Sequence, residues 1–423
     1  MTTIPDPASP GPSSSPLRVL RHRSFRRLWI GSLTSAAGTA VGGIILTWLV
    51  YSATHSPLAI SLLGIVQFLP TLGFGLVAGA LIDRLDRRRL MMSCDVARAI
   101  CFAGLALFVL LYGVDLAVLI GAVFVVATFS TVFRPATNAA VPRLLETRDL
   151  ADGNGLLQGG STIAQFVGSP LGGLFLLTVG ASVGLAFNAL TFAVSGTMIF
   201  LMVIPTGSRP DGVPRPKRSL LGEVRDGLRF VRTQRALLII TATAMASNFF
   251  LTMWGSFMVF YAGDQLHQGA AGFSVLVAAS TAGFAIGAIV PGRLHMERAP
   301  GFWLLPTWGF VGLLLLGLAW TRSLWLAVPL TTVAGALLSM GNTTWLSGVQ
   351  RTVPDEFLGR YFATDEAGSY AMIPAGIAVG GVLIFTLGIS WTYAIAGIGA
   401  LVVNIPFLIT PGVRAWGRVT AVG

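Results

Sequence analysis

Long apolar stretches alternate with short polar breaks along almost the whole chain. A helix that crosses a bilayer needs about 20 mostly apolar residues, and the first stretch, LWIGSLTSAAGTAVGGIILTWLVY, is long enough. The pattern predicts an all-α membrane protein with twelve transmembrane helices. The predicted spans are 27–53, 57–82, 90–113, 116–138, 154–179, 181–205, 236–262, 271–294, 301–321, 324–348, 363–388 and 390–411.

The composition supports the same class of protein. Of the 423 residues, 54% are hydrophobic and 11% are charged, and the mean hydropathy is +0.77. A soluble protein has about 25% charged residues. This difference excludes a soluble domain of ordinary composition.

The net charge of +11 would fit a nucleic-acid partner, but the positions of the basic residues favour another explanation. When the polar breaks are assigned to alternate sides of a membrane, one side holds Arg322 and the other holds nearly all the remaining basic residues outside the spans. This is the positive-inside rule, so we expect both termini to be cytoplasmic and no nucleic acid to bind. The basic residues on the cytoplasmic side are Arg18, Arg21, Arg23, Arg26, Arg27, a cluster at 84–89, Arg143, Arg148, Lys217, Arg218, Arg293, Arg298, Arg351, Arg360, Arg414 and Arg418.

The chain divides into two six-span halves. The segment PTGSRPDGVPRPKRS at 205–219 cannot span a membrane, and LLGEVRDGLRFVRTQ after it has the spacing of an amphipathic helix on the inner leaflet. The predicted organisation is a cytoplasmic tail (1–24), a first six-helix bundle (25–205), a cytoplasmic linker with an amphipathic helix (206–235), a second bundle (236–411) and a second tail (412–423).

The two halves repeat one another in sequence. AAVPRLLETRDL before span 5 matches RTVPDEFLGRYF before span 11, and GSPLGG in span 5 matches IPAGIAVGG in span 11. GALIDRLDRR after span 2 matches GAIVPGRLHMER after span 8. Three matches in the same order indicate a tandem repeat of one membrane unit.

The stretch GALIDRLDRR also resembles the signature loop of the major facilitator superfamily, Gly-x-x-x-Asp-Arg-x-Gly-Arg-Arg. Asp86 stands at the second glycine, as in the enterobactin-exporter and macrolide-efflux-like branch, which LRHRSFRRLWIGSLTS, DVARA, FRPATNAAVP and QRTVPDEFLGR also resemble. The resemblance implies two pseudo-symmetric six-helix bundles that usually work as a monomer. The residues that match the signature are Gly79, Asp83, Arg84, Arg87 and Arg88.

The signature loop has two explanations. It is either a topology anchor or a gate, and an anchor needs basic residues only. The resemblance implies that Asp83 latches the two halves by lying under the N-terminus of span 11, near 360–365. Asp95 and Arg98 have the i,i+3 spacing of an ion pair on span 3 and would extend this gate.

The middle of the spans carries neutral polar and aromatic residues instead of acids. Each of the polar residues alone is more often a helix-to-helix hydrogen bond than a ligand contact. Together they favour an uncharged cavity that accepts a bulky amphipathic molecule. The candidate cavity residues are Thr39, Gln67, Thr128, Gln165, Asn248, Trp254, Asn342, Trp345 and Tyr370.

Asp365 and Glu366 are the candidates for proton coupling. Two adjacent acids disfavour joint ionisation, which raises the pKa of one of them. The alternative is that both acids only favour the N-terminus of span 11 through the helix dipole. Proton coupling itself is implied by the resemblance.

We therefore predict a secondary active exporter, driven by inward proton flow, for an amphipathic drug, antibiotic or siderophore. A lipid or lysophospholipid transporter, and a membrane sensor or scaffold that transports nothing, remain as alternatives. The sequence has no nucleotide-binding loop, Ser/His/Asp set or metal cluster, so we expect no enzyme activity, cofactor or metal. With Lys217 as the single lysine among 28 basic residues, the composition is typical of a GC-rich bacterium, and we expect the inner membrane.

Overall fold

A computed structural model describes residues 16–71, 73–74, 85–203 and 228–418. These residues form helices joined by short turns, and no strand occurs among them. Three residues of the predicted gate, Gly79, Asp83 and Arg84, lie outside the described residues, as does most of the predicted linker.

The structure describes six α-helices in the first half. They are α1 (Arg23–Thr54), α2 (Pro57–Val66), α4 (Arg87–Tyr112), α5 (Leu116–Leu144), α6 (Leu150–Thr178) and α7 (Ala181–Leu201). Two short 3-10 turns, η1 (Pro16–Arg21) and η2 (Thr147–Asp149), lie at the start of α1 and of α6.

In the second half, two of the candidate membrane-crossing segments contain a π-helical turn. The first is built from α9 (Arg235–Ser256), α10 (Met258–Phe260) and η3 (Tyr261–Gln265), and another from α12 (Pro300–Leu304), η5 (Leu305–Gly309) and α13 (Phe310–Trp320). The remaining elements are α11 (Gly269–Arg293), η4 (Met296–Arg298), α14 (Leu324–Thr352), α15 (Asp355–Leu387), α16 (Ile389–Val403), α17 (Ile405–Ile409) and α18 (Pro411–Arg414).

The described residues contain eleven helical segments that are long and apolar enough to cross a membrane, and a shorter apolar helical segment at Pro57–Thr71. The shorter segment corresponds to the predicted span 57–82, most of whose remainder lies outside the described residues. The prediction of an all-α membrane protein is confirmed.

Several helices are longer than the apolar stretches that predicted them. α5 continues to Leu144 instead of ending at 138, and α15 begins at Asp355 instead of 363. The backbone hydrogen bonds of a helix do not need apolar side chains, so a helix can extend beyond the apolar stretch, and α15 begins directly after Pro354. This extension places the charged residues near these ends inside a helix instead of at its terminus.

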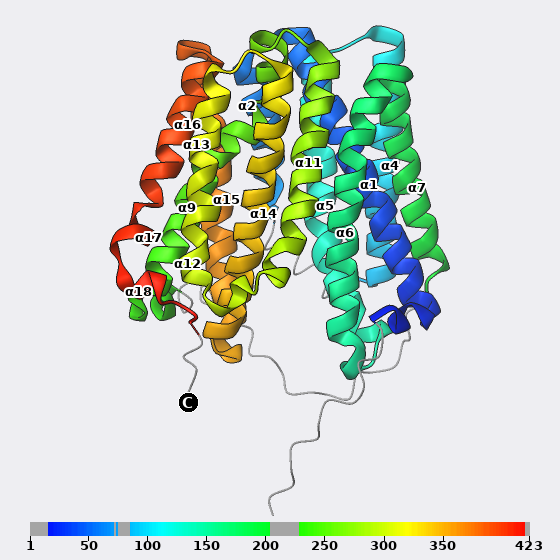
Figure 1. Cartoon of the computed structure of the whole chain (residues 1–423). Coiled ribbons are helices and arrows are strands. Elements are labelled where there is room, and N and C mark those ends of the chain that lie inside the picture. Colours follow the sequence, from blue (N-terminus) through cyan, green and yellow to red (C-terminus); the bar gives the residue numbers. More distant parts are fainter. Residues whose placement is uncertain (1–15, 72, 75–84, 204–227, 419–423) are drawn as a thin grey trace, which may run out of the picture.

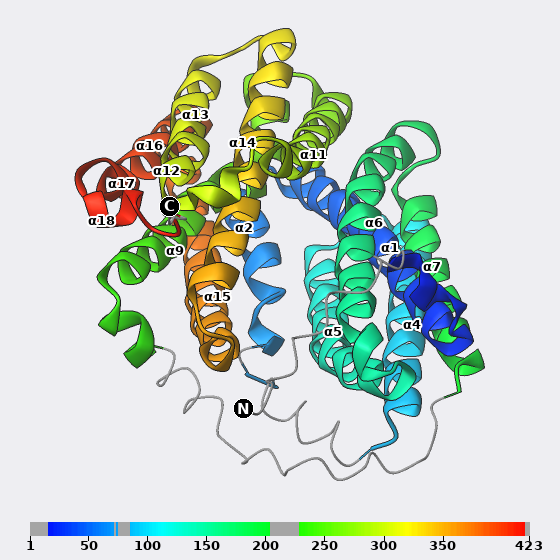
Figure 2. The ribbon, with the colours of Figure 1, turned by 60° about the horizontal axis from the view of Figure 1, so that its bottom comes forward.

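The two halves form two bundles that meet along two helix pairs. α6 packs against α11, and α2 packs against α15. We call the end of the molecule at which α1 begins the terminal side, and the end at which α1 finishes the far side. The bundles lie side by side at the far side, and their ribbons diverge toward the terminal side (Figures 1 and 2).

Within each half, small residues let neighbouring helices approach closely. A Cβ added at Gly168 of α6 would lie 2.4 Å from the carbonyl oxygen of Ala37 in α1. In the second half, a Cβ at Gly287 of α11 would lie 2.1 Å from the carbonyl oxygen of Ala336 in α14. Such close packing replaces the hydrophobic effect as the source of stability between helices in lipid.

Candidate functional site

The described part of the signature loop joins three helices at the terminal side. The carboxylate of Asp86 accepts a hydrogen bond from the Arg89 N–H at 2.8 Å and caps the start of α4. Arg87 donates to the carbonyl of Ala139 in α5 at 3.1 Å, and Arg88 donates to the carbonyl oxygens of 199 and 200 at the end of α7. Cations are favoured at helix C-termini.

The cap explains why an aspartate follows the Arg84–Leu85 dipeptide in this chain. Asp is among the preferred residues for capping a helix N-terminus, and here it starts α4 directly. Asp86 stands where the superfamily signature has a glycine. The Asp before a helical run was the signal that could have identified the cap.

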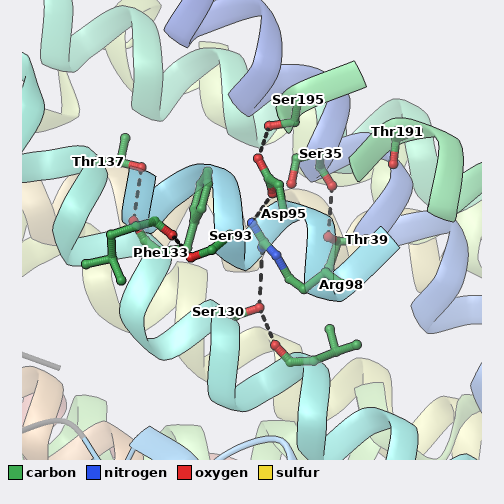
Figure 3. Close-up of polar contacts among 12 residues, drawn as sticks. Ser35, Thr39, Ser93, Asp95, Arg98, Ser130, Phe133, Thr137, Thr191 and Ser195 are labelled. Atoms are coloured by element: carbon green, nitrogen blue, oxygen red, sulfur yellow. Dashed lines mark hydrogen bonds and ion pairs between the residues drawn. The ribbon is translucent and has the colours of Figure 1, made fainter. Parts of the chain in front are cut away.

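A buried ion pair lies on α4 in the middle of the first half (Figure 3). Asp95 is 0% exposed and Arg98 is 4% exposed, and the Arg98 guanidinium donates to the Asp95 carboxylate. The i,i+3 pair expected from the spacing is therefore present. The second carboxylate oxygen accepts from Ser195 of α7 at 2.7 Å.

Aromatic rings complete the surroundings of Arg98. Its guanidinium carbon lies 4.2 Å from the ring centre of Phe133 and 4.5 Å from that of Phe192, and Ser130 of α5 accepts a hydrogen bond from it at 3.4 Å. A charge in the membrane interior needs such partners. The partners all belong to the first half, so this cluster joins α4, α5 and α7 to one another.

At the far side, a tyrosine and an aspartate join the two halves. The Tyr51 hydroxyl of α1 donates to the Asp264 carboxylate of η3 at 2.6 Å. The Tyr51 ring lies edge-on to Phe260 with 4.9 Å between ring centres, and a Cβ added at Gly263 would lie 1.8 Å from the Tyr51 hydroxyl. Glycine is therefore required for this approach.

Further contacts close the far side between the halves. The Trp48 ring stacks on Phe273 of α11 at 6.4 Å. Ser61 of α2 donates to the carbonyl of Ile377 in α15 at 3.0 Å, and a Cβ at Gly381 would lie 3.0 Å from the Ser61 Cβ. We call the contacts of Tyr51, Asp264, Trp48, Phe273, Ser61, Ile377 and Gly381 the far-side closure.

The candidate cavity residues fall into two groups. Thr39, Gln67, Gln165 and Asn342 are exposed, and Thr128 is half-buried. Among the described residues, the side chains of Thr39, Thr128 and Gln165 bond only to carbonyl oxygens of their own helix, each four residues earlier. These side chains are accessible in this conformation.

Three of the other candidates pack against neighbouring helices, and the side chain of the fourth is outside the described residues. Asn248 donates to Ser369 of α15 at 3.0 Å, which is a helix-to-helix hydrogen bond. Trp254 is 4% exposed and packs in the core, and Trp345 packs beside Tyr361 and Phe362. For Trp254 the structure corrects the expectation of a cavity wall, because the rest of its half covers it. The side chain of Tyr370 is outside the described residues.

The two adjacent acids lie farther from the start of their helix than the sequence predicted. α15 begins ten residues before Asp365, so Asp365 and Glu366 lie about 15 Å along the helix from its start. The helix-dipole explanation was wrong, because that effect falls off within the first turn. Asp365 is half-buried and Glu366 is exposed.

Arg134 is a charged residue that the sequence analysis overlooked. It lies ten residues before the end of α5, about 15 Å from that end. The side chain is exposed, and in the described part of the chain it has no hydrogen-bond or ion-pair partner. A charge inside the apolar pattern of span 4 was the signal that could have identified it.

A charged cluster outside the membrane spans fixes η1. Arg18 donates to Asp149 of η2 at 2.7 Å, and His22 lies 3.6 Å from the other carboxylate oxygen. The hydrogen bond from Arg18 holds the pKa of Asp149 below its ordinary value of 3.8.

In the described part of the chain no three His, Cys, Asp or Glu side chains gather in a way that could hold a metal ion.

Comparison with known proteins gives the family. A family model described as transmembrane secretion effector, within the major facilitator superfamily, matches residues 14–417. The chain belongs to this family. The expected resemblance to the major facilitator superfamily is thereby confirmed.

Curated relatives match over nearly their full length. The multidrug efflux pump Tap of Mycolicibacterium fortuitum is 27% identical over 399 residues, which cover 90% of this chain and 94% of that protein. The enterobactin exporter EntS of Shigella boydii is 26% identical over 400 residues, covering 92% of each.

Solved structures confirm the fold class. The nucleoside transporter NupG has a TM-score of 0.64 at 14% identity, covering 91% of this chain and 98% of that chain. A bacterial homologue of the lysosomal transporter Spinster has a TM-score of 0.62 at 14% identity, covering 97% and 100%. The chain therefore has the major-facilitator fold.

Proposed function

We propose that this protein is a secondary active exporter that moves an amphipathic small molecule out of a bacterial cell by alternating access. The family and the names of the relatives, a multidrug efflux pump and an enterobactin exporter, support export. The observation that carries the mechanism is the far-side closure, in which Tyr51 and Asp264 join the two halves at the far side.

The distribution of basic residues supports the orientation. Arg23, Arg26 and Arg89 are exposed at the terminal side, and the positive-inside rule then assigns that side to the cytoplasm. In this orientation the far side faces outward and is closed. The described conformation is then the one that accepts cargo from the cytoplasm, and both termini are cytoplasmic.

We infer that the signature loop holds the opposite state. When the terminal side closes, Asp83 would lie under the N-terminus of α15, where the helix dipole favours a carboxylate. Asp83→Asn should then reduce export strongly while the protein remains in the membrane. Normal export by a fully inserted Asp83→Asn protein would contradict this role.

Protons are the energy source that we propose, with Asp365 and Glu366 as the coupling acids. Their position within the candidate span Phe357–Leu387 supports this proposal, because an acid inside a transporter span is commonly part of an ion pathway. The double variant Asp365→Asn/Glu366→Gln should lose transport driven by a pH gradient and retain exchange of cargo without a gradient. Unchanged gradient-driven transport in this variant would exclude both acids.

Transport by the purified protein in inside-out vesicles tests the whole proposal. Accumulation of a hydrophobic dye or antibiotic that depends on a pH gradient is the expected result, with vesicles treated with a proton carrier as the control. Movement of lysophospholipid without movement of drugs would instead identify a lipid transporter. A protein that moves neither class would be a sensor or scaffold.

A further inference from the structure

α6 is held between one helix of its own half and one helix of the other half. On one side, Gly168 packs against the backbone of α1 at Ala37. On another side, a Cβ added at Gly173 would lie 2.4 Å from the Ser274 side chain of α11. Two sectors of the helix surface remain between these contacts.

The two remaining sectors differ in chemistry. One sector exposes the apolar side chains of Ile163, Val167 and Leu174, which are 63%, 55% and 53% exposed. Successive residues of a helix are about 100° apart, so the polar residues spaced at three and four positions lie opposite that sector. We call them the polar ladder of α6, and they are Asn154, Gln158, Ser161, Gln165 and Ser169.

The chemistry decides which sector faces lipid. Exposed apolar side chains are favourable against hydrocarbon, and amide groups are not. The sector of Ile163, Val167 and Leu174 therefore faces lipid, and the polar ladder faces the space between the two halves. Gln158 and Gln165 are both exposed there.

The ladder has hydrogen-bonding capacity that the protein does not use. Ser169 donates to the Gln165 carbonyl at 3.0 Å, and the Gln165 amide donates to the Ser161 carbonyl at 3.3 Å. Within the described part of the chain, the side-chain amides of Asn154 and Gln158 have no hydrogen-bond partner. Each free amide offers both donors and acceptors.

The internal repeat supports the assignment of the polar ladder to the side of α6 that faces the other half. Gly160 of α6 and Gly368 of α15 are 208 residues apart, and each packs against the first helix of its half, α1 or α9. At the same offset Gln158 corresponds to Glu366, which is exposed as well. The wall of the first half is therefore neutral where the wall of the second half carries a carboxylate.

We propose that the polar ladder of α6 contacts the cargo and selects molecules that carry uncharged hydroxyl, carbonyl or amide groups. This inference rests on the proposed export function. An uncharged cargo group that bonds to Gln158 or Gln165 replaces water without leaving a buried partner unsatisfied, whereas a group that cannot bond leaves the amide unpaired.

Accessibility tests the geometry without any cargo. In a variant with Cys94→Ser and Cys101→Ser, single Gln158→Cys and Gln165→Cys substitutions should react with a charged thiol reagent added to inside-out vesicles. Ile163→Cys and Val167→Cys are the matched controls on the other sector and should stay unreactive. Reactivity at the control positions and none at the ladder would overturn the inference.

Transport tests the cargo class. Erythromycin, which is rich in hydroxyl and carbonyl groups, is compared with tetraphenylphosphonium, which has no hydrogen-bonding group. Gln158→Leu and Gln165→Leu should each raise the KM for erythromycin about five-fold, the effect of one neutral hydrogen bond, and leave the KM for tetraphenylphosphonium unchanged.

The two proposals fail in different ways. If both probes move as in the wild type after both substitutions, the ladder does not contact cargo and the inference is overturned, while export stands. If wild-type vesicles accumulate neither probe under a pH gradient, the result counts against export of such molecules. Val167→Leu controls for a general effect of substitution in α6.

Discussion

At the scale of single residues, the Asp95–Arg98 pair shows how a charge is kept inside a membrane bundle. The carboxylate is bonded by Arg98 and Ser195, and the guanidinium lies between two aromatic rings. Because each ion is compensated by a partner in the same half, removing one partner is more costly than replacing both.

We predict that Arg98→Leu alone lowers the stability of the protein by about 3–5 kcal/mol, since it leaves the Asp95 carboxylate buried without a counter-ion. The stability of the double variant Asp95→Leu/Arg98→Leu should fall much less. Thermal unfolding in detergent measures both values. Equal losses in the single and double variants would show that the pair itself is not what the site requires.

The same double variant also shows whether the ion pair has only a structural role or takes part in gating. If the pair only joins α4, α5 and α7, a stable double variant should retain transport. If the pair belongs to the gate with the signature loop, transport should be lost although the protein is stable. The vesicle assay distinguishes the two results.

Asp149 gives a prediction about pH. Its pKa is lowered in the folded protein by Arg18, so its stabilising effect is fully present above the ordinary value of 3.8 and is lost as pH falls through the lowered pKa. The difference in Tm between wild type and Asp149→Asn should be constant from about pH 7 to 5 and shrink below the ordinary value. A difference that grows as pH falls would contradict this sign.

At the scale of helices, the π-helical turn η3 positions the far-side closure. The Gln265 amide donates to the Ala319 carbonyl at 2.9 Å and to the Thr321 carbonyl at 3.0 Å, and its own oxygen accepts from Ser390. These bonds fix η3 to the second half. Asp264 is thereby held where Tyr51 of the first half can reach it.

We predict that Tyr51→Phe shifts the protein toward the state that is open at the far side. A hydrogen bond to a charged group contributes about 1.5–3 kcal/mol, so the open population should rise about ten-fold or more. Labelling of Phe273→Cys by an impermeant thiol reagent added outside intact cells measures this shift. The background for the measurement carries Cys94→Ser and Cys101→Ser.

Tyr261→Phe is the matched control for this experiment. The Tyr261 hydroxyl donates to the Thr321 carbonyl at 3.2 Å within the second half, so losing it should not change labelling at 273. Equal labelling in the Tyr51 and Tyr261 variants would mean that the bond between the halves does not control opening.

Helix existence was predictable and helix ends were not. The apolar pattern located α5 and α15, but the ends of both helices lie beyond it because backbone hydrogen bonding continues into polar sequence. The apolar pattern therefore does not report that Arg134 lies ten residues inside the end of α5, and it places Asp365 at a helix start instead of ten residues into α15. The distance of a charge from its helix terminus depends on where the helix ends, which side-chain hydropathy does not report.

At the scale of the whole molecule, the closed far side predicts a reversible lock. In Ser61→Cys/Gly381→Cys the two Cβ atoms begin about as close as a disulfide requires, since a Cβ at 381 lies 3.0 Å from that of Ser61. Oxidation should stop transport completely, and a reductant should restore it, because the halves can no longer separate at the far side.

Thr71→Cys/Thr131→Cys provides the control for the lock. The two hydroxyls lie 3.1 Å apart, one at the end of the helical segment Pro57–Thr71 and one on α5 of the same half, so oxidation of this pair should leave transport intact. Continued transport by the fully oxidised 61/381 pair would refute alternating access about the far-side closure.

The sequence by itself determined the class of the protein, the repeat of its two halves and its family resemblance. These properties follow from linear patterns, because an apolar stretch of bilayer length has few alternatives to a spanning helix. Only the tertiary structure decided which polar residues pair and which stay exposed. Tyr51 and Asp264 are 213 residues apart in sequence. The sequence made Trp254 and Gln165 equal candidates for the cavity wall, but neighbouring helices bury Trp254 and leave Gln165 exposed. The face that a membrane helix presents inward is set by the helices packed around it, and that arrangement cannot be read from one helix alone.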